Sequence, residues 1–334
     1  MNKVAVVILN WNGQTFLEQF LPSVVNYSDN ARIIVADNNS TDNSIVFLKE
    51  HYPTVELIKL EQNFGFAGGY NNALKQVDSE YYVLLNSDVE VTKNWLTPMI
   101  ELLDTDQSIA ACQPKIKDYN NKEFFEYAGA SGGFIDKYGY PFCRGRIFDS
   151  LEKDNHQYNN IEEIFWASGA SLFIRAKDFN NIGGLDELFF AHMEEIDLCW
   201  RLKNQGKKIM VCPSSTVYHI GGGTLNKVNS QKTFLNFRNS LLTIHKNASK
   251  KECFSIIFIR LLLDGLAGLK FIISGKPSHT WAIIRAHFSF YGAISQNKTK
   301  RKVFNSPNLT GQIHKSIVKG YYLNSCKSFN NFIK

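Results

Sequence analysis

Three carboxylates lie within four residues in the stretch AHMEEIDLCWRLKNQG (191–206), whose apolar spacing and final glycine predict a helix. On that helix Glu194 and Asp197 share one face with Arg201, so Asp197 and Arg201 can form an ion pair. Glu195 points about 100° away from Glu194. Acidic residues in the first turn interact favourably with the helix dipole, but this does not explain three of them beside an apolar run. Such carboxylates are candidates for taking up and releasing a proton.

A further carboxylate, Asp88, interrupts the stretch YVLLNSDVEV (82–91). An apolar run typical of a buried strand stops there at Asn86, Ser87 and Asp88, and then resumes. A tight turn explains this break. A metal site explains it equally well, because Mg²⁺ and Mn²⁺ favour carboxylate oxygens as ligands.

The elements that position these residues are expected to be alternating strands and helices. Short β-rich runs cover 3–11, 31–39, 54–63 and 80–88, and helical patterns lie between them at 15–27, 42–51 and 67–77. Alternation at this spacing predicts βαβ units and a parallel sheet with right-handed crossovers. Ligands of such sheets bind at the carboxyl ends of the strands, so the residues that follow each run are the first candidates for a site.

All four strand ends carry polar or glycine-rich sequences. They read NWNG from residue 10, DNNSTD from residue 37, NFGFAGG from residue 63 and NSD from residue 86. Four such ends on an otherwise apolar sheet indicate a binding site rather than four unrelated turns. The GxGxxG fingerprint of dinucleotide-binding enzymes does not follow the first strand, and no Walker A sequence is present. The dehydrogenase and P-loop classes are therefore excluded.

Composition describes an ordinary globular chain with an uneven charge. Of its 334 residues 44% are hydrophobic and 20% are charged, so long disordered segments are not expected. Six widely spaced cysteines without a CxxC pair predict a reduced, intracellular protein. From Asn226 onward, 18 lysines and arginines face two acids, giving about +16 within a net charge of +6. This asymmetry predicts an anionic partner for the C-terminal part.

Five segments in order resemble the inverting family 2 glycosyltransferases, especially their rhamnosyltransferase-like branch. The segments are VVILNWNG, VADNNSTDNS, NFGFAGGYNNAL, LLNSDVEV and LFFAHMEEIDLCWRLKNQG. The resemblance covers roughly residues 3–225 and implies an α/β protein with the GT-A fold, a Rossmann-like, mostly parallel sheet flanked by helices. We expect a nucleotide-binding part over about 1–115, an acceptor-binding and catalytic part over about 116–225, and a basic, amphipathic helical appendage over 226–334.

The resemblance also implies which strand-end residues bind the donor nucleotide. Asp37 matches the acid that reads the pyrimidine, because a carboxylate can accept the N3–H of uracil or thymine; the alternative is an Asx-turn. Asp88 matches the last acid of the DxD-type motif, which holds a divalent cation, Mg²⁺ or Mn²⁺, on the donor phosphates. The first acid of that motif is Asn86 here, which weakens the case for a clamp of two carboxylates. The other donor-binding candidates are Asn10, Asn63, Gly65, Ala67, Asn71, Asn86 and Ser87.

Two further segments match the acceptor side of the family. His219, in TVYHIGGGT, corresponds to a histidine that often binds the metal, although a lone histidine is more often structural. Trp166, Ser168 and Gly169, in FWASGASLFIR, correspond to the acceptor-binding segment. Trp166 can stack on a sugar ring or pack in the core, and the small residues let an acceptor approach the backbone.

In the family the acidic helix reads Glu-Asp-x-Asp, and its second acid is the general base. That position is Glu195 here, one methylene longer than the family's aspartate, and Glu194 is the competing base. Asp197 is expected to organise the helix through Arg201. The base removes a proton from an acceptor hydroxyl as this oxygen attacks the anomeric carbon, and the single displacement inverts the configuration.

The C-terminal part carries apolar helical patterns interrupted by charges. Arg260, Asp264 and Lys270 make a transmembrane helix unexpected, and on a helical wheel they share an arc of about 120° that leaves a broad apolar face. This pattern is typical of a helix in a membrane interface or of one packed on the globular part. The basic charge favours an anionic membrane surface. Nucleic acid is not an expected partner, because the basic residues lie beside aliphatic stripes rather than stacking aromatics.

We therefore expect a cytoplasmic enzyme at the inner face of the cytoplasmic membrane. It would transfer a sugar to a glycan acceptor, carried on a lipid, in bacterial surface polysaccharide synthesis. Rhamnose from dTDP-rhamnose is the first expected donor, and UDP-hexoses are the alternative. Two other functions stay open. A sugar nucleotidyltransferase would carry an activating basic loop near the first strand and no acidic helix at 191–201, and a non-catalytic membrane scaffold would bind sugar nucleotides without turnover.

Overall fold

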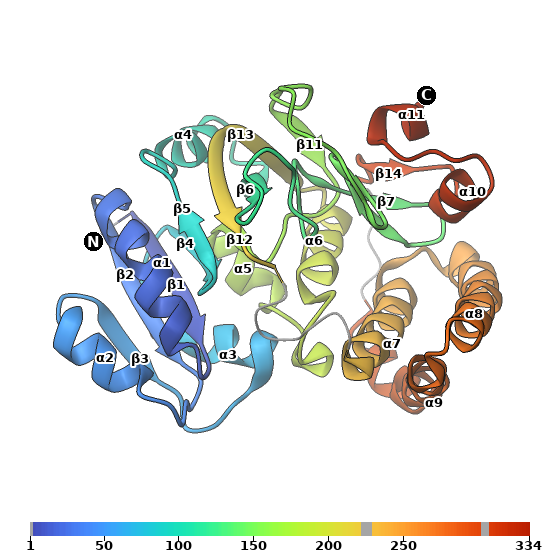
Figure 1. The fold of residues 1–334 in the computed structure, drawn as a ribbon, viewed down its shortest axis with the longest axis horizontal. Coiled ribbons are helices and arrows are strands. Elements are labelled where there is room, and N and C mark those ends of the chain that lie inside the picture. The colour runs from blue at the N-terminus through green and yellow to red at the C-terminus, as the bar shows by residue number, and fades with distance from the viewer. Residues whose placement is uncertain (1–2, 222–228, 302–306) are drawn as a thin grey trace.

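The protein is built around one large sheet (Figure 1), and the computed structural model describes residues 3–221, 229–301 and 307–334. The sheet contains β1 (Val4–Asn10), β2 (Ala31–Asp37), β3 (Glu56–Lys59), β4 (Tyr81–Asn86), β5 (Val89–Val91), β6 (Ile109–Asp118), β11 (Glu162–Ile164), β12 (Ser171–Arg175) and β13 (Lys208–His219). The order is β11-β13-β6-β12-β4-β1-β2-β3, with β5 paired to β13. The four strands predicted from the sequence are parallel neighbours, and β12 joins them antiparallel to β4.

Helices cover both faces of this sheet. On one face lie α1 (Gln14–Tyr27), α2 (Ser44–His51) and α4 (Thr97–Thr105), and on the other α3 (Gly65–Leu74), α5 (Ala176–Ile182) and α6 (Glu194–Asn204). Alternate residues of β1 face the two layers: Val4 and Val6 pack with the first group, Ala5 and Val7 with the second. A strand buried on both sides must be apolar throughout, which explains the continuous apolar run from which it was predicted.

A smaller sheet packs beside the large one. It contains β7 (Gly133–Asp136), β8 (Pro141–Cys143), β9 (Arg146–Ile147), β10 (Ser150–Leu151) and β14 (Gln312–Ile313), in the order β10-β9-β8-β7-β14. The last strand comes from the C-terminal part of the chain and pairs in parallel with β7, Gln312 opposite Ile135. The C-terminal part therefore completes a sheet that begins in the middle of the chain.

The predicted C-terminal helices are present as α7 (Ser230–Asn247), α8 (Lys250–Ile273), α9 (Pro277–Thr299), α10 (Ile317–Tyr322) and α11 (Phe329–Ile333). α7 packs on α6 and on α9, so the helices are joined to the large domain through α7 and β14. The expected boundary at residues 225 and 226 lies outside the described residues. Within the described parts of the chain, none of the helices combines the length and the apolar character needed to cross a membrane.

Candidate active site

The ends of β1, β2 and β4 meet at one edge of the sheet, where Asn10 lies opposite Asp37 and Leu9 opposite Asn86. The side-chain amide of Asn10 donates to a carboxylate oxygen of Asp37 at 3.1 Å. The backbone N–H of Ser40 donates to the other oxygen at 3.0 Å. The turn considered as an alternative role for Asp37 is therefore present, and the Asp37 side chain is buried within it. These contacts fix the carboxylate beside the end of β1.

The next strand end builds the start of α3. Asn63 accepts hydrogen bonds from the side chain of Asn38, at 3.0 Å, and from the backbone N–H of Gly65, at 2.8 Å. Gly65 has φ of +71°, and a Cβ there would lie 2.6 Å from the ring of Phe190. Only glycine fits this position. The backbone N–H of Ala67 donates to the carbonyl of Phe190 at 3.3 Å, so the start of α3 is tied to the segment that precedes the acidic helix.

Asn86 ends β4, and Ser87 follows it on the same edge. A Cβ added to Gly13 would lie 2.5 Å from the side-chain oxygen of Asn10 and 3.7 Å from the hydroxyl of Ser87. The loop after β1 therefore lies close to the loop after β4. The backbone N–H of Asn86 donates to the carbonyl of Ala170 at 3.0 Å, which brings the predicted acceptor segment to this edge.

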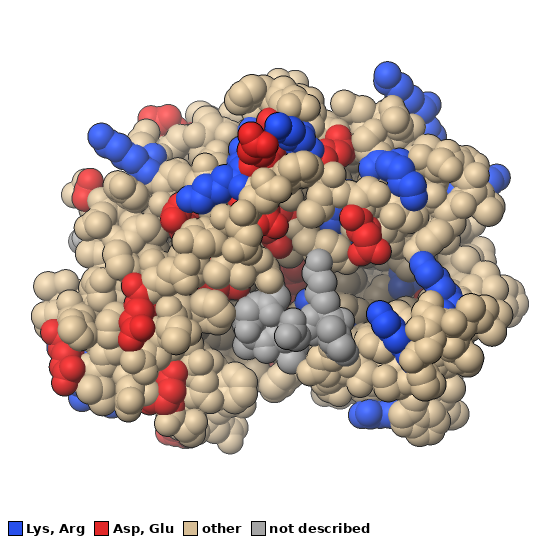
Figure 2. Space-filling view, viewed as in Figure 1, with Lys and Arg blue, Asp and Glu red and all other residues tan. Residues whose placement is uncertain are grey.

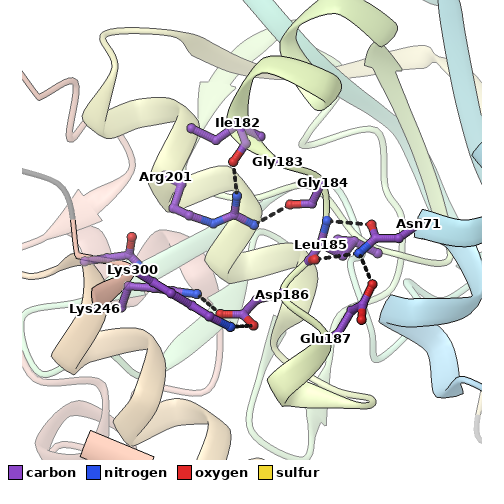
Figure 3. Close-up of a pocket in the computed structure, with 11 residues that line it drawn as sticks. Asn71, Ile182, Gly183, Gly184, Leu185, Asp186, Glu187, Arg201, Lys246 and Lys300 are labelled. Carbon is purple, nitrogen blue, oxygen red and sulfur yellow. Dashed lines mark hydrogen bonds and ion pairs between the residues drawn. The ribbon is translucent and has the colours of Figure 1, made fainter. Parts of the chain in front are cut away.

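Asn71 is the donor-binding candidate whose side chain is fully engaged elsewhere. Its amide nitrogen donates to the carbonyl of Leu185 at 2.8 Å and to the carboxylate of Glu187 at 3.1 Å, and its oxygen accepts from the Leu185 N–H at 2.9 Å. These bonds tie α3 to the short 3₁₀ helix η1 (Glu187–Phe189) (Figure 3). In this structure Asn71 has a structural role.

Asp88 and His219 come together across the pairing of β5 with β13. The Nε2 atom of His219 lies 3.1 Å from the Oδ1 atom of Asp88 and 3.4 Å from the amide of Asn86. Its Nδ1 atom lies 3.5 Å from the carboxylate of Glu126. Burial alone would lower the pKa of His219, but Asp88 and Glu126 raise this pKa to about 10. The histidine is thus held between two acids.

This arrangement fits a divalent cation. Asp88 Oδ1 and His219 Nε2 lie 3.1 Å apart in a hydrogen-bonded contact, so an ion held by both side chains would displace the proton between them. A carboxylate oxygen and an imidazole nitrogen both suit Mn²⁺. Glu126, behind the other ring nitrogen, stands where a carboxylate orients a metal-binding histidine. Residues 3–221, 229–301 and 307–334 contain no group of three or more histidine, cysteine, aspartate or glutamate side chains that could hold a metal ion. Of the three glycines that follow in the sequence after His219 and Ile220, two lie outside the described residues.

Of the three acceptor-binding candidates, Gly169 lies near Glu195, whereas Ser168 and Trp166 are buried in the core. A Cβ on Gly169 would lie 3.3 Å from the ring of Phe66 and 3.8 Å from the Cβ of Glu195. Ser168 is buried and donates its hydroxyl hydrogen to the carbonyl of Ala128. Gly169 is therefore the candidate that borders Glu195.

Trp166 lies in the core. Its indole N–H donates to the carbonyl of Phe134 at 2.9 Å, and its ring packs on Gly133, where a Cβ would lie 2.2 Å away. The side chain is 3% exposed, so the ring offers no open surface to a sugar. The stacking role expected for Trp166 is not seen, and the packing alternative describes it.

Asp197 is held by three partners, and the predicted ion pair with Arg201 is confirmed at 2.8 Å. Lys246 of α7 lies 2.9 Å from the same carboxylate, and the amide of Asn247 donates to it at 2.7 Å. The side chain is fully buried. Asp197 therefore connects the acidic helix to α7, and both of its oxygens have partners within the protein.

Glu194 and Glu195 differ from Asp197, because each has a buried carboxylate oxygen without a hydrogen-bond partner. Burial, and then the charge of Glu195, raises the pKa of Glu194 well above its usual range. Burial raises the pKa of Glu195 to about 7. Glu194 is enclosed, whereas Glu195 is half-buried and borders Gly169. A carboxyl with a pKa near neutrality is suited to act as a general base.

The segment before α6 is held in an uncommon backbone conformation. Phe190, His192 and Met193 have φ of +64°, +69° and +74°, which costs side-chain-bearing residues roughly 1–2 kcal/mol each. The side-chain amide of Asn239, on α7, lies 2.7 to 3.0 Å from three carbonyl oxygens of residues 189–192. These contacts offset the strain and set the start of the acidic helix.

Glu126 and Asn239 were not predicted from the sequence. Glu126 lies in an irregular segment without periodicity, and nothing in its neighbours indicates a contact with His219. Asn239 is one polar residue on an amphipathic helix. A buried asparagine among apolar neighbours is a weak signal of a structural contact.

A cavity of about 380 Å³ lies between the segment 182–187 and helices α6, α7 and α9 (Figure 3). Its cationic groups are already paired: Lys246 and Lys300 contact Asp186, and Arg201 donates to two backbone carbonyls as well as to Asp197. Of the predicted site residues, Asn71 lines it. The residues that line the cavity do not include Asp37, Asp88 or Glu195.

Residues 5–171 match the profile of Glycosyl transferase family 2. The chain belongs to this family. It is a glycosyltransferase, as the five segments predicted, and the acidic helix lies beyond the matched residues.

Known relatives of this glycosyltransferase include two rhamnosyltransferases. The N-acetylglucosaminyl-diphospho-decaprenol L-rhamnosyltransferase of Mycobacterium tuberculosis (strain CDC 1551 / Oshkosh) is 24% identical over 230 residues, covering 64% of this chain and 75% of the relative. Rhamnosyltransferase WbbL of Escherichia coli (strain K12) is 22% identical over 226 residues, covering 65% and 83%. The resemblance to the rhamnosyltransferase-like branch is thus supported by relatives of modest identity.

Solved structures share the fold of this glycosyltransferase. GalNAc-T7, crystallised with UDP, GalNAc and Mn²⁺, has a TM-score of 0.58 at 17% identity, over 74% of this chain and 48% of that one. Mannosyltransferase PcManGT from Pyrobaculum calidifontis, in complex with GDP-Man and Mn²⁺, has a TM-score of 0.53 at 14% identity, over 90% and 88%. The predicted GT-A fold is confirmed.

Proposed function

We propose that this glycosyltransferase moves a sugar from a nucleoside diphosphate donor to a hydroxyl group of a glycan acceptor, with inversion at the anomeric carbon. The observation that carries the proposal is Glu195, a half-buried residue whose carboxyl has a pKa near 7 and whose Cβ lies beside Gly169. The pair Asp88 and His219 and the strand-end residue Asp37 supply the remaining parts. Asp37 would accept the N3–H of the pyrimidine.

The reaction needs one base and one leaving group. Deprotonated Glu195 takes the proton of the acceptor hydroxyl while this oxygen attacks the anomeric carbon. A carbon–oxygen bond to the acceptor forms as the bond to the diphosphate breaks, and the nucleoside diphosphate leaves with the electron pair. Asp88 and His219 would hold the Mg²⁺ or Mn²⁺ ion that neutralises charge on the departing diphosphate.

The relatives support a donor and an acceptor class. Because both relatives named above are rhamnosyltransferases, dTDP-rhamnose is our first proposed donor, and UDP-hexoses are the alternative. The mycobacterial relative is named for an acceptor carried on a lipid diphosphate. We propose a lipid-linked glycan acceptor in bacterial surface polysaccharide synthesis, and attachment of the enzyme to the inner face of the cytoplasmic membrane through its basic C-terminal part.

Calorimetric titration with dTDP, UDP and GDP, each with and without Mn²⁺, tests the donor site. We expect binding of the pyrimidine diphosphates that strengthens with Mn²⁺, and loss of the Mn²⁺ effect in the Asp88→Asn variant, because the amide no longer contributes a negative ligand. A preference for dTDP over UDP would favour a deoxysugar donor. Absence of nucleotide binding under every condition would contradict the proposal, and binding without any turnover would favour the scaffold.

The rate of transfer is expected to depend on pH through Glu195. Because the base acts when deprotonated and its pKa is raised to about 7, kcat/KM should rise with pH up to about 7 and then level. With an ordinary glutamate as the base, the midpoint of this rise in kcat/KM would lie at about pH 4.3. Initial rates of nucleoside diphosphate release across this range measure the midpoint, and a midpoint below about pH 5 would contradict the assignment.

A further inference from the structure

Helix α8 presents its polar side to the protein and its apolar side to the outside. Arg260 and Asp264 are buried, at 3% and 0% exposure. The opposite side exposes Phe254, Phe258, Leu262, Leu266, Leu269, Ile272 and Ile273, at 53% to 82%. Surface helices of globular proteins normally show the reverse arrangement. An apolar face of this extent marks an interaction surface.

The polar side fixes this orientation. The guanidinium of Arg260 lies 3.7 Å from the centre of the Tyr140 ring and donates to the carbonyls of Tyr138 and Gly139 at 3.2 Å. Asp264 contacts His287 of α9 at 3.1 Å. Rotating α8 to bury its apolar side would break these contacts and leave the carbonyls of Tyr138 and Gly139 without this donor, which is costly. The outward apolar side is therefore a fixed feature of the fold.

The exposed surface continues onto α9, which packs beside α8. Trp281, Ile284, Phe288 and Tyr291 are 40% to 70% exposed. We call these residues and the exposed residues of α8 the outer face. Tryptophan and tyrosine are enriched where proteins meet the boundary between water and lipid, because their rings are apolar and carry one polar group. The outer face thus contains both exposed aliphatic side chains and amphipathic aromatic side chains.

The charges around the outer face are almost all positive. Exposed basic residues on α8, α9 and the turn between them are Lys250, Lys251, Lys270, Lys276, Arg285 and Lys298. Among the described residues from 229 to 301, Glu252 is the exposed acid. In Figure 2 lysine and arginine predominate on the right-hand side, over α8 and α10, whereas acids lie mainly over the left and centre. A second copy would bring like charges together, whereas an anionic lipid surface complements them.

We propose that the outer face docks on an anionic bilayer, with its apolar side chains in the interfacial region and its basic rim on the lipid headgroups. Helices α8 and α9 then lie along the membrane surface, and the polar contacts of Arg260 and Asp264 hold the catalytic domain above it. This deepens the proposed membrane attachment and names the surface that makes it.

Co-sedimentation of the full chain with lipid vesicles tests the outer face. We expect binding to phosphatidylcholine vesicles that contain phosphatidylglycerol, and weaker binding to phosphatidylcholine alone. The double variant Phe258→Ser with Leu266→Ser should bind at least about 10-fold more weakly, because two apolar side chains no longer enter the lipid. The control pair Val46→Ser with Ile161→Ser removes apolar groups of similar exposure, 51% and 52%, from α2 and the segment before β11, and should bind as the wild type does.

Three outcomes would overturn the docking. The first is that the wild type binds neither kind of vesicle. The second is an equal loss of vesicle binding in both pairs of variants. The third is a wild-type dimer in light scattering that the Phe258→Ser and Leu266→Ser pair converts to monomer without changing vesicle binding. Calorimetry with dTDP and UDP on the same samples separates this proposal from the function. Nucleotide binding without vesicle binding would overturn the docking alone, and vesicle binding without nucleotide binding would overturn the donor site alone.

Discussion

The Glu195→Gln variant is expected to lose sugar transfer by at least about 100-fold while binding nucleoside diphosphate as the wild type does. Glutamine has nearly the shape of glutamate but cannot accept the hydroxyl proton. One carboxylate oxygen of Glu195 has no hydrogen-bond partner, and glutamine keeps an oxygen that can accept the backbone hydrogen bonds made by the carboxyl. Asp37 and Asp88, which we propose bind the donor, lie at the strand ends and are not altered, so donor binding should not change.

Single-turnover rates and calorimetric affinities, measured on the same preparation, check this result. Unchanged turnover in Glu195→Gln would remove this residue from the role of base. The Glu194→Gln variant tests the competing assignment. Its carboxyl is buried with one unpartnered oxygen and a pKa well above the usual range, so we expect the amide to raise the melting temperature. A large loss of transfer in Glu194→Gln, with Glu195→Gln active, would assign the base to Glu194.

The parts of this site that the sequence predicted are those that follow from local pattern. The apolar runs located β1, β2, β3 and β4 to within a few residues, and parallel strands place their ends on one edge, so Asn10, Asp37 and Asn86 were found without a structure. The acidic helix was likewise visible from its periodicity. Its true start at Glu194 was not, because the left-handed residues before it are held by distant contacts.

The parts that the sequence did not predict depend on contacts between distant segments. Glu126 approaches His219 from an irregular segment, and β14 joins β7 from the other end of the chain. The wheel of α8 showed a polar arc opposite an apolar face. Contacts with Tyr140 and His287 determine that the polar side packs against the protein. No pattern within α8 reveals these contacts.

The same long-range contacts lead to the second large effect, the Lys246→Met variant. The ammonium group of Lys246 is buried between two carboxylates, 2.5 Å from Asp186 and 2.9 Å from Asp197. Methionine fills a similar volume but leaves both acids without this partner. Removing one member of a buried ion pair costs about 3–5 kcal/mol, and we expect the free energy of unfolding to fall by this amount at neutral pH.

A second lysine provides the matched control for Lys246→Met. Lys300 also contacts Asp186, but its side chain is 38% exposed and water can replace it, so Lys300→Met should cost at most about 1 kcal/mol. Urea unfolding of both variants at pH 7 measures the difference, and equal losses would contradict it.

The effect of Lys246→Met should also depend on pH. Burial would raise the pKa of Asp186, but Lys246 and Lys300 hold it at about 2. A depressed carboxyl pKa stabilises the fold above the unfolded value of about 3.9, and this contribution disappears as pH falls toward 2. The loss caused by Lys246→Met should therefore shrink when unfolding is measured below about pH 4. A loss that stays constant between pH 7 and about pH 3 would show that packing, rather than charge, makes Lys246 important at the junction of α6 and α7.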